Sequence, residues 1–145
     1  MDVKISIGAD HGGYEMMQIL KEWIQEKWVI TKDFGTHSNE SVDYPVFAHQ
    51  VAMSVENYDS DFGILICGSG QGMAITANKH QGIRAALCWN KVIAALARQH
   101  NNANILVLPG RFLTLSQAIE ITEAFLTVEF EGGRHQKRID QIFPF

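Results

Sequence analysis

The chain has 145 residues, of which 46% are hydrophobic and 19% are charged, and its formal net charge is −4. This size and composition predict one domain over residues 1–145 that buries a substantial core, because a second domain would have too few residues for a core of its own. The negative charge disfavours nucleic acid as the main partner, and no apolar run approaches the ~20 residues that a membrane span needs.

The first residues have a strand-like pattern, not that of a basic, apolar, cleavable leader. The two cysteines, Cys67 and Cys88, match no metal-binding spacing, so reduced thiols are expected. Together these features predict a cytoplasmic protein.

Short apolar runs alternate with helical patterns along the chain, which is typical of an α/β protein. We expect a three-layer, doubly wound, Rossmann-like sandwich in which helices cover both faces of a five-stranded parallel sheet. The expected strands are residues 4–8, 29–34, 62–67, 83–87 and 105–108. The expected helices are residues 13–27, 45–56, 73–79, 91–99 and 116–126, with Thr114 as the N-cap of the last, followed by a basic helix within residues 132–142.

The segment 63–72 is an apolar strand that delivers Cys67 into a loop rich in glycine. Ligands of open α/β sheets bind at the carboxyl ends of the strands, and the amino terminus of the following helix favours an anion. Both effects predict a thiolate at Cys67. The alternative is that Cys67 is a small buried hydrophobe and that the glycines merely allow a tight turn.

Nucleotide binding by this loop is a weaker hypothesis. No Lys-Ser or Lys-Thr pair follows the last glycine, Gly72, as a Walker loop requires. The glycine spacing is also one residue short of the dinucleotide fingerprint.

Two further polar segments border predicted strands. Asp10-His11-Gly12-Gly13 follows the first strand, and His100-Asn101-Asn102 comes immediately before the fifth. We expect the sheet to gather both segments and Cys67 into one crevice. The alternatives are that Asp10 caps a helix and that His100 is a solvated helix end.

Arg134 and Arg138 are four residues apart and therefore share one face if their segment is helical. Two guanidinium groups on one face suit a phosphate, although a solvated basic face is the alternative, and Arg111 has the same two interpretations. The remaining histidines show no metal-ligand spacing and are interpreted as surface or capping residues: His37, His49, His80 and His135.

Several ordered motifs resemble those of one family, the B-type ribose-5-phosphate isomerases, within the wider group that also holds the galactose-6-phosphate isomerase subunits. The resemblance runs nearly from end to end. The motifs are Gly8-Ala9-Asp10-His11-Gly12-Gly13, Asp33-Phe34-Gly35-Thr36, Asp43-Tyr44-Pro45, residues 64–72, Ala77-Asn78-Lys79, Gly82-Ile83-Arg84-Ala85-Ala86, Arg98-Gln99-His100-Asn101-Asn102 and Glu131-Gly132-Gly133-Arg134-His135.

The resemblance implies an aldose–ketose isomerase that interconverts D-ribose 5-phosphate and D-ribulose 5-phosphate in the non-oxidative pentose phosphate pathway. It implies neither a metal nor an organic cofactor. In this family Cys67 would move a proton between C2 and C1 through an enediolate. Some members use a glutamate near this loop instead, but Gln71 and Met73 offer no carboxylate.

The resemblance also implies roles for individual residues. The catalytic set would be Cys67, His100 for ring opening, Asp10 for the substrate hydroxyls, and Ser69 as a support of the loop. His11 would hold the phosphate together with Arg111, Arg134 and Arg138. Asn101 would stabilise the enediolate. The complete substrate-binding set is His11, Tyr44, Gly68, Gly70, Gln71, Gly72, Asn101, Arg111, Arg134 and Arg138.

Family members assemble as homodimers or homotetramers with shared sites, so a neighbour is expected to supply His100, Asn101 and Arg111. The apolar end, residues 142–145, would pack either on a subunit or in the core. Two alternative functions remain at this stage: isomerisation of a six-carbon aldose phosphate such as allose 6-phosphate, and a binding protein for sugar phosphates without turnover.

Overall fold

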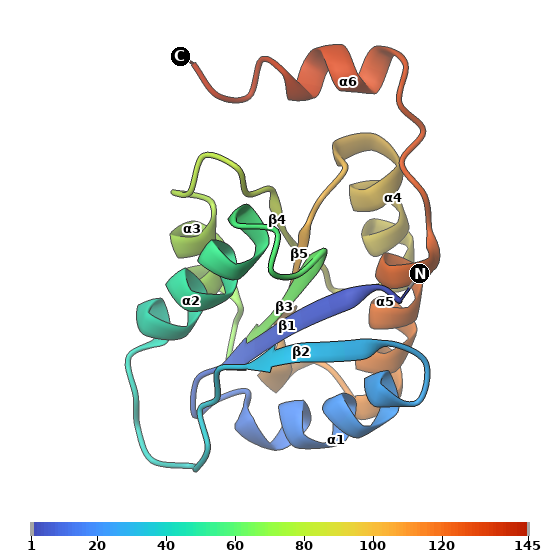
Figure 1. The fold of residues 1–145 in the computed structure, drawn as a ribbon. Helices are drawn as coiled ribbons and strands as arrows, with labels where there is room; N and C mark the ends of the chain where they lie inside the picture. The colour runs from blue at the N-terminus through green and yellow to red at the C-terminus, as the bar shows by residue number, and fades with distance from the viewer. Residues whose placement is uncertain (1, 145) are drawn as a thin grey trace.

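The computed structural model describes residues 2–144 and contains a parallel sheet of five strands in the order β2-β1-β3-β5-β4 (Figure 1). The strands are β1 (Lys4–Ala9), β2 (Val29–Asp33), β3 (Phe62–Cys67), β4 (Ala85–Leu87) and β5 (Ile105–Pro109). The helices are α1 (Tyr14–Gln25), α2 (Tyr44–Glu56), α3 (Gln71–Ala77), α4 (Lys91–Asn101), α5 (Leu115–Thr127) and α6 (Arg134–Ile139), and a 3-10 turn, η1, covers Gly110–Phe112.

Helices cover both faces of the sheet, as the sequence predicts. Successive side chains of β3 point to opposite faces of the sheet and enter two separate cores. Ile64 and Ile66 face α1, α4 and α5, whereas Leu65 and Cys67 face α2 and α3. Cys67 therefore lies on the side of the sheet that α2 and α3 cover. The three-layer α/β class is confirmed.

The point where the chain reverses its direction across the sheet lies between β1 and β3. From β1 the chain moves outward to β2, and after α2 it returns to the other side of β1 as β3. The loops after β1 and β3 therefore diverge at the carboxyl edge of the sheet, and such a switch point is where doubly wound proteins bind ligands.

Several element ends differ from those expected. β4 begins at Ala85 instead of residue 83, because the Ile83 N–H closes a turn onto the His80 carbonyl oxygen at 3.1 Å. α3 begins earlier, at Gln71, directly after Gly70 in the left-handed region at φ 79°. Thr114 is the N-cap of α5, as expected, and forms a capping box with Gln117.

The C-terminal segment is helical only over α6. Ile142 and Phe143 are 61% and 39% exposed, so of the two alternatives for this end, packing in the core does not hold for these two residues. Residue 145 lies outside the described residues. None of the helices within residues 2–144 is both long and apolar enough to cross a membrane.

Phe125 of α5 is fully buried and meets the ring of Phe62 edge-on, with ring centroids 5.7 Å apart. We expect Phe125→Ala to lower the free energy of unfolding by about 3–5 kcal/mol, because the variant leaves a cavity between α5 and the sheet. Denaturant titration followed by circular dichroism measures this. The control is Phe112→Ala, at a side chain that is 73% exposed, for which the change should stay within about 0.5 kcal/mol. Equal effects of the two substitutions would contradict the assigned core.

Candidate active site

The loops after β1 and β3 pack directly on each other at the switch point. The Asp10 N–H donates to the Ile66 carbonyl oxygen at 3.2 Å, and the buried Asp10 carboxylate accepts the Gly12 N–H at 2.9 Å. A Cβ at Gly12 would press on the backbone of Gly68. Glycine at this position lets the Asp10 side chain lie beside the loop that begins at Cys67.

Cys67 ends β3 with its side chain nearly buried, and its Sγ accepts the Gly70 N–H at 3.1 Å. Burial raises the pKa of the Cys67 thiol above its ordinary value, and the Asp10 carboxylate also raises it. Backbone hydrogen bonds from Met73 and Gly70 and the charge of Arg111 act in the opposite direction but do not offset burial. The prediction of a depressed pKa, and so of a thiolate, is therefore wrong for the single chain, because desolvation of the sulfur outweighs the lowering by the backbone N–H groups at the start of α3.

The loop after Cys67 presents backbone donors. The Ser69 hydroxyl accepts the Gln71 N–H at 3.3 Å, and this hydrogen bond shapes the start of α3. Within residues 2–144 the N–H groups of Ser69 and Gly72 have no acceptor. The Tyr44 ring lies where a side chain at position 72 would be. Because Gly72 has no side chain, this ring can pack against the loop. The arrangement suits a small anion held by backbone groups.

The side chains of Arg111 and His11 border the same loop. The backbone N–H of Arg111 donates to the Gly68 carbonyl oxygen at 3.0 Å, and a Cβ at Gly68 would come within 3.1 Å of the Arg111 guanidinium, so this group lies close over the loop. His11 accepts the Val42 N–H on Nδ1 at 3.2 Å, which leaves Nε2 available to a ligand. Arg111 thus lies beside the Cys67 of its own chain, in contrast to the expectation that a neighbour supplies it. We call Asp10, His11, Tyr44, residues 67–72 and Arg111 the carboxyl-edge half-site.

The other candidate residues lie elsewhere, around the carboxyl end of α4 and along α6. They line a cavity of about 390 Å³ formed by His100, Asn101, Arg134, His135, Arg138, Ile139 and Ile142. Arg134 and Arg138 share a face of α6, as predicted, and neither has a carboxylate partner within residues 2–144. We call His100, Asn101, Arg134 and Arg138 the amino-edge half-site.

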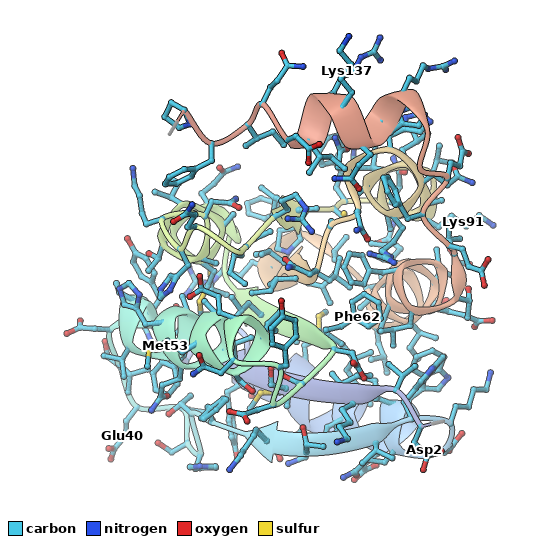
Figure 2. All side chains as sticks on the ribbon, turned by 45° about the horizontal axis from the view of Figure 1, so that its top comes forward. Asp2, Glu40, Met53, Phe62, Lys91 and Lys137 are labelled. Carbon is cyan, nitrogen blue, oxygen red and sulfur yellow. The ribbon has the colours of Figure 1, made fainter. Side chains whose placement is uncertain are left out.

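The two half-sites lie at opposite ends of the strands. The guanidinium of Arg98, two residues before His100, lies 4.6 Å from the Phe62 ring, and Phe62 is the first residue of β3 (Figure 2). Cys67 is the last residue of this six-residue strand, about 16 Å farther along at ~3.3 Å per residue. Figure 1 accordingly shows α6 over the end of α4, far from the arrowhead of β2.

The prediction of a single crevice is therefore wrong within one chain. His100 precedes β5, and a residue before a strand lies at the amino edge of a parallel sheet, whereas Asp10 and Cys67 end their strands. The sequence already indicated this separation. A crossover helix runs antiparallel to the strands that it connects, so a residue at its carboxyl end lies at the amino edge of the sheet.

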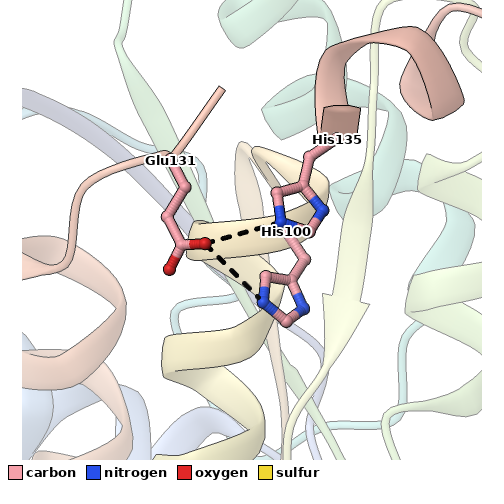
Figure 3. Close-up of side chains that lie close together, drawn as sticks. All are labelled: His100, Glu131 and His135. Carbon is pink, nitrogen blue, oxygen red and sulfur yellow. Dashed lines mark ion pairs between the residues drawn. The ribbon is translucent and has the colours of Figure 1, made fainter. Parts of the chain in front are cut away.

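The surroundings of His100 were not expected from the sequence (Figure 3). His135, expected on the surface, is only 7% exposed, and its ring stacks on that of His100 with centroids 4.3 Å apart and an interplanar angle of 13°. One Glu131 carboxylate oxygen lies 3.4 Å from His135 Nε2 and 3.9 Å from His100 Nε2. The only sequence signal was the position of both residues in the Glu-Gly-Gly-Arg-His motif.

His100, Glu131 and His135 are also the one group within residues 2–144 whose ligand atoms lie close enough together to hold a metal ion. Their geometry fits a metal poorly. The lone pairs of imidazole nitrogens lie in the ring planes, so those of two nearly parallel stacked rings do not converge on one point.

His80 is likewise more than a surface residue. Its Nδ1 lies 2.8 Å from a Glu56 carboxylate oxygen, and its Nε2 lies 2.7 Å from His49 Nδ1. These contacts hold the turn after α3 against α2.

Comparison with known proteins identifies close relatives. A family model described as Ribose/Galactose Isomerase matches residues 5–142. The probable ribose-5-phosphate isomerase B of Mycoplasma genitalium is 46% identical over 100% of this chain and 97% of its own length. The ribose-5-phosphate isomerase B of Escherichia coli is 44% identical over 96% of this chain and 93% of its own.

Solved structures agree. The ribose 5-phosphate isomerase of Thermotoga maritima superposes with a TM-score of 0.95 at 49% identity, covering 98% of each chain. The Mycoplasma genitalium ribose-5-phosphate isomerase B with bound ribulose-5-phosphate superposes with a TM-score of 0.92 at 47% identity, covering 98% of this chain and 95% of that one.

The raised pKa of Cys67 predicts its reactivity. A thiol reacts as the thiolate, so alkylation of Cys67 by iodoacetamide should increase with pH and reach its midpoint above the ~8.5 of a free cysteine. Mass spectrometry of the Cys88→Ala variant measures Cys67 alone. Cys88 is a suitable residue to remove, because burial raises the pKa of its thiol to about 12. A midpoint below the free value would show that desolvation does not dominate at Cys67 in the protein in solution.

Proposed function

We propose that this chain, which belongs to the ribose/galactose isomerase family, interconverts D-ribose 5-phosphate and D-ribulose 5-phosphate. The chain is an aldose–ketose isomerase, as its relatives are. The observation that carries the proposal is Cys67, whose sulfur lies at the switch point between Asp10 and Arg111 beside unpartnered backbone donors. The relative with bound ribulose-5-phosphate supports a five-carbon substrate.

Cys67 would act as the base. Its thiolate takes the proton from C2 of the open-chain aldose, and the C–H electron pair forms the C1–C2 double bond while O1 gains negative charge. Return of the proton to C1, with transfer of the hydroxyl proton from O2 to O1, gives the ketose. A base of raised pKa accepts a carbon-bound proton more readily, although less of it is ionised at neutral pH.

The enediolate formed between these steps carries negative charge, which the backbone N–H groups of the loop after Cys67 would stabilise. The N–H groups of Ser69 and Gly72 are already in place and point to no acceptor of their own within the described chain. Donors that need no rearrangement stabilise such an intermediate by about 3 kcal/mol each. Asp10 would bind the substrate hydroxyls beside them.

His100 would open the furanose ring, and Arg134 and Arg138 would bind the phosphate. The backbone of an open-chain pentose phosphate spans about 7 Å from C1 to phosphorus, at ~1.2 Å per bond. The two half-sites of one chain are separated by roughly twice that length, as the extent of β3 shows. One substrate therefore reaches both half-sites only where two chains face each other.

We accordingly propose a homodimer, or a homotetramer built from such dimers, with shared active sites. The carboxyl-edge half-site of one chain would meet the amino-edge half-site of the other. The exposed Ile142 and Phe143 border the amino-edge half-site and would be covered in this contact. The two thiols are free, which suits a reducing cytoplasm, the compartment that we expect.

The first experiment measures ketose formation from ribose 5-phosphate in the presence of a metal chelator. Wild type should turn over, and Cys67→Ala should lose at least about 100-fold in kcat, because a general base is removed. Cys88→Ala is the matched control, a buried cysteine in the core on the opposite face of the sheet from Cys67, and should retain activity. Substantial turnover by Cys67→Ala would refute the cysteine mechanism, and an inactive wild type would direct the assay to six-carbon aldose phosphates.

A mixing experiment tests the shared site. Cys67→Ala and His100→Ala should each be inactive alone, yet dimers that contain one chain of each should have one intact site and one site with both substitutions. Co-refolding equal amounts should restore about a quarter of wild-type activity, because half of the dimers are mixed and each carries one working site of two. Failure to regain activity, with mixed dimers verified by mass spectrometry, would show that each site is built within one chain.

A further inference from the structure

We propose that Glu131 and His135 form a clamp that orients the His100 imidazole for opening of the sugar ring. The inference rests on the proposed function, because it assigns positioning residues to the step in which His100 would act. It concerns ring opening alone and leaves proton transfer at Cys67 untouched.

The clamp holds His100 from two directions (Figure 3). The His135 ring covers one face of the His100 ring at 4.3 Å, and the Glu131 carboxylate lies 3.9 Å from its Nε2. Stacking restricts the plane of the imidazole, and the negative charge of the carboxylate favours the orientation in which Nε2 faces it. A side chain that is 42% exposed would otherwise sample several rotamers.

The backbone is arranged to place both members of the clamp. The Glu131 N–H donates to the Gln99 carbonyl oxygen at 3.0 Å, which fixes Glu131 beside the residue that precedes His100. Gly132 and Gly133 then turn the chain back with φ values of 69° and 57°. Their surroundings are open, with no atom within 4 Å of a Cβ placed at either residue, so glycine is needed here for conformation and not for space.

The same turn places His135 over His100. His135 is 7% exposed and its Nε2 lies 3.4 Å from the Glu131 carboxylate, so this carboxylate faces both imidazoles. The contact with Glu131 is what a phenylalanine could not supply.

The clamp leaves Nδ1 of His100 available to the substrate. Because Nε2 faces Glu131, Nδ1 is the nitrogen that remains for the ring oxygen or the anomeric hydroxyl of a substrate. Holding one imidazole nitrogen with a carboxylate while the other moves a proton is a recurrent arrangement in acid–base catalysis. Glu131 and His135 are therefore positioning residues and make no contact with the reacting atoms.

The chemistry of the two sugars allows this step to be isolated. Ribose 5-phosphate is mainly a furanose and must open, whereas ribulose 5-phosphate cannot close a furanose because its O5 carries the phosphate. Exchange of the C1 hydrogen of ribulose 5-phosphate with deuterated water therefore reports proton transfer without ring opening. Ketose formation from ribose 5-phosphate requires both steps.

Both rates should be measured for Glu131→Gln and His135→Phe. We expect ketose formation to fall by at least about tenfold in each variant, while deuterium exchange at C1 stays within about twofold of wild type. Glu129→Gln is the matched control, an exposed carboxylate two residues away, and should change neither rate. Glu131→Gln keeps the shape of an exposed side chain, so it remains informative if His135→Phe does not fold.

Two outcomes would overturn the clamp: ketose formation unchanged in Glu131→Gln, or an equal fall of both rates, which would indicate a general structural role. Failure of the proposed function looks different. It would appear in the wild type as the absence of both rates, or in His100→Ala as the absence of a selective loss of ketose formation.

Discussion

The arrangement of the molecule depends on the parallel pairing of β1 with β3. Ile5 to Ala9 align residue by residue with Phe62 to Ile66, so the two strands end side by side. This pairing places Asp10 and Cys67 at one edge and provides the switch point between their loops. The parallel pairing of β5 with β3 places His100, which precedes β5, at the opposite edge. The division of the candidate residues into two half-sites follows from these parallel pairings.

Close backbone approach makes the carboxyl-edge half-site compact. Gly13 has no room for a side chain, since a Cβ there would overlap the Ile66 carbonyl group, and Gly70 takes a left-handed conformation before α3. The compact packing also explains the raised pKa of Cys67, because it removes water from the sulfur. The same contacts therefore supply the donors of the loop and make the thiolate harder to form.

The amino-edge half-site is held by two partly or fully buried guanidinium groups. Arg84 donates to the carbonyl oxygens of Asn101 and Asn102, and Arg98 donates to that of Ala103 while it stacks on Phe62. These contacts fix the turn after α4, which presents His100 and Asn101. Asn102 takes a left-handed conformation there, at φ 45°, and its carbonyl and amide oxygens are both bound. The turn that presents His100 and Asn101 is thus held by contacts within one chain.

The sequence by itself determined the local structure and the chemical inventory. The apolar strand that ends at Cys67 predicted β3 correctly to both ends, Thr114 marked the start of α5, and the four-residue spacing of Arg134 and Arg138 predicted their shared face. These features depend on neighbours along the chain, where hydrophobic periodicity, capping and helical spacing act.

Only the tertiary structure decided which residues meet. It separated His100 from Cys67 by the length of a strand, placed Arg111 beside Cys67, and stacked His135, 35 positions away in the sequence, on His100. It also decided the ionisation of Cys67, because burial depends on what α2 and α3 place over the sheet. Such contacts arise when segments far apart in the sequence pack together. The spacing of residues along the chain does not predict them.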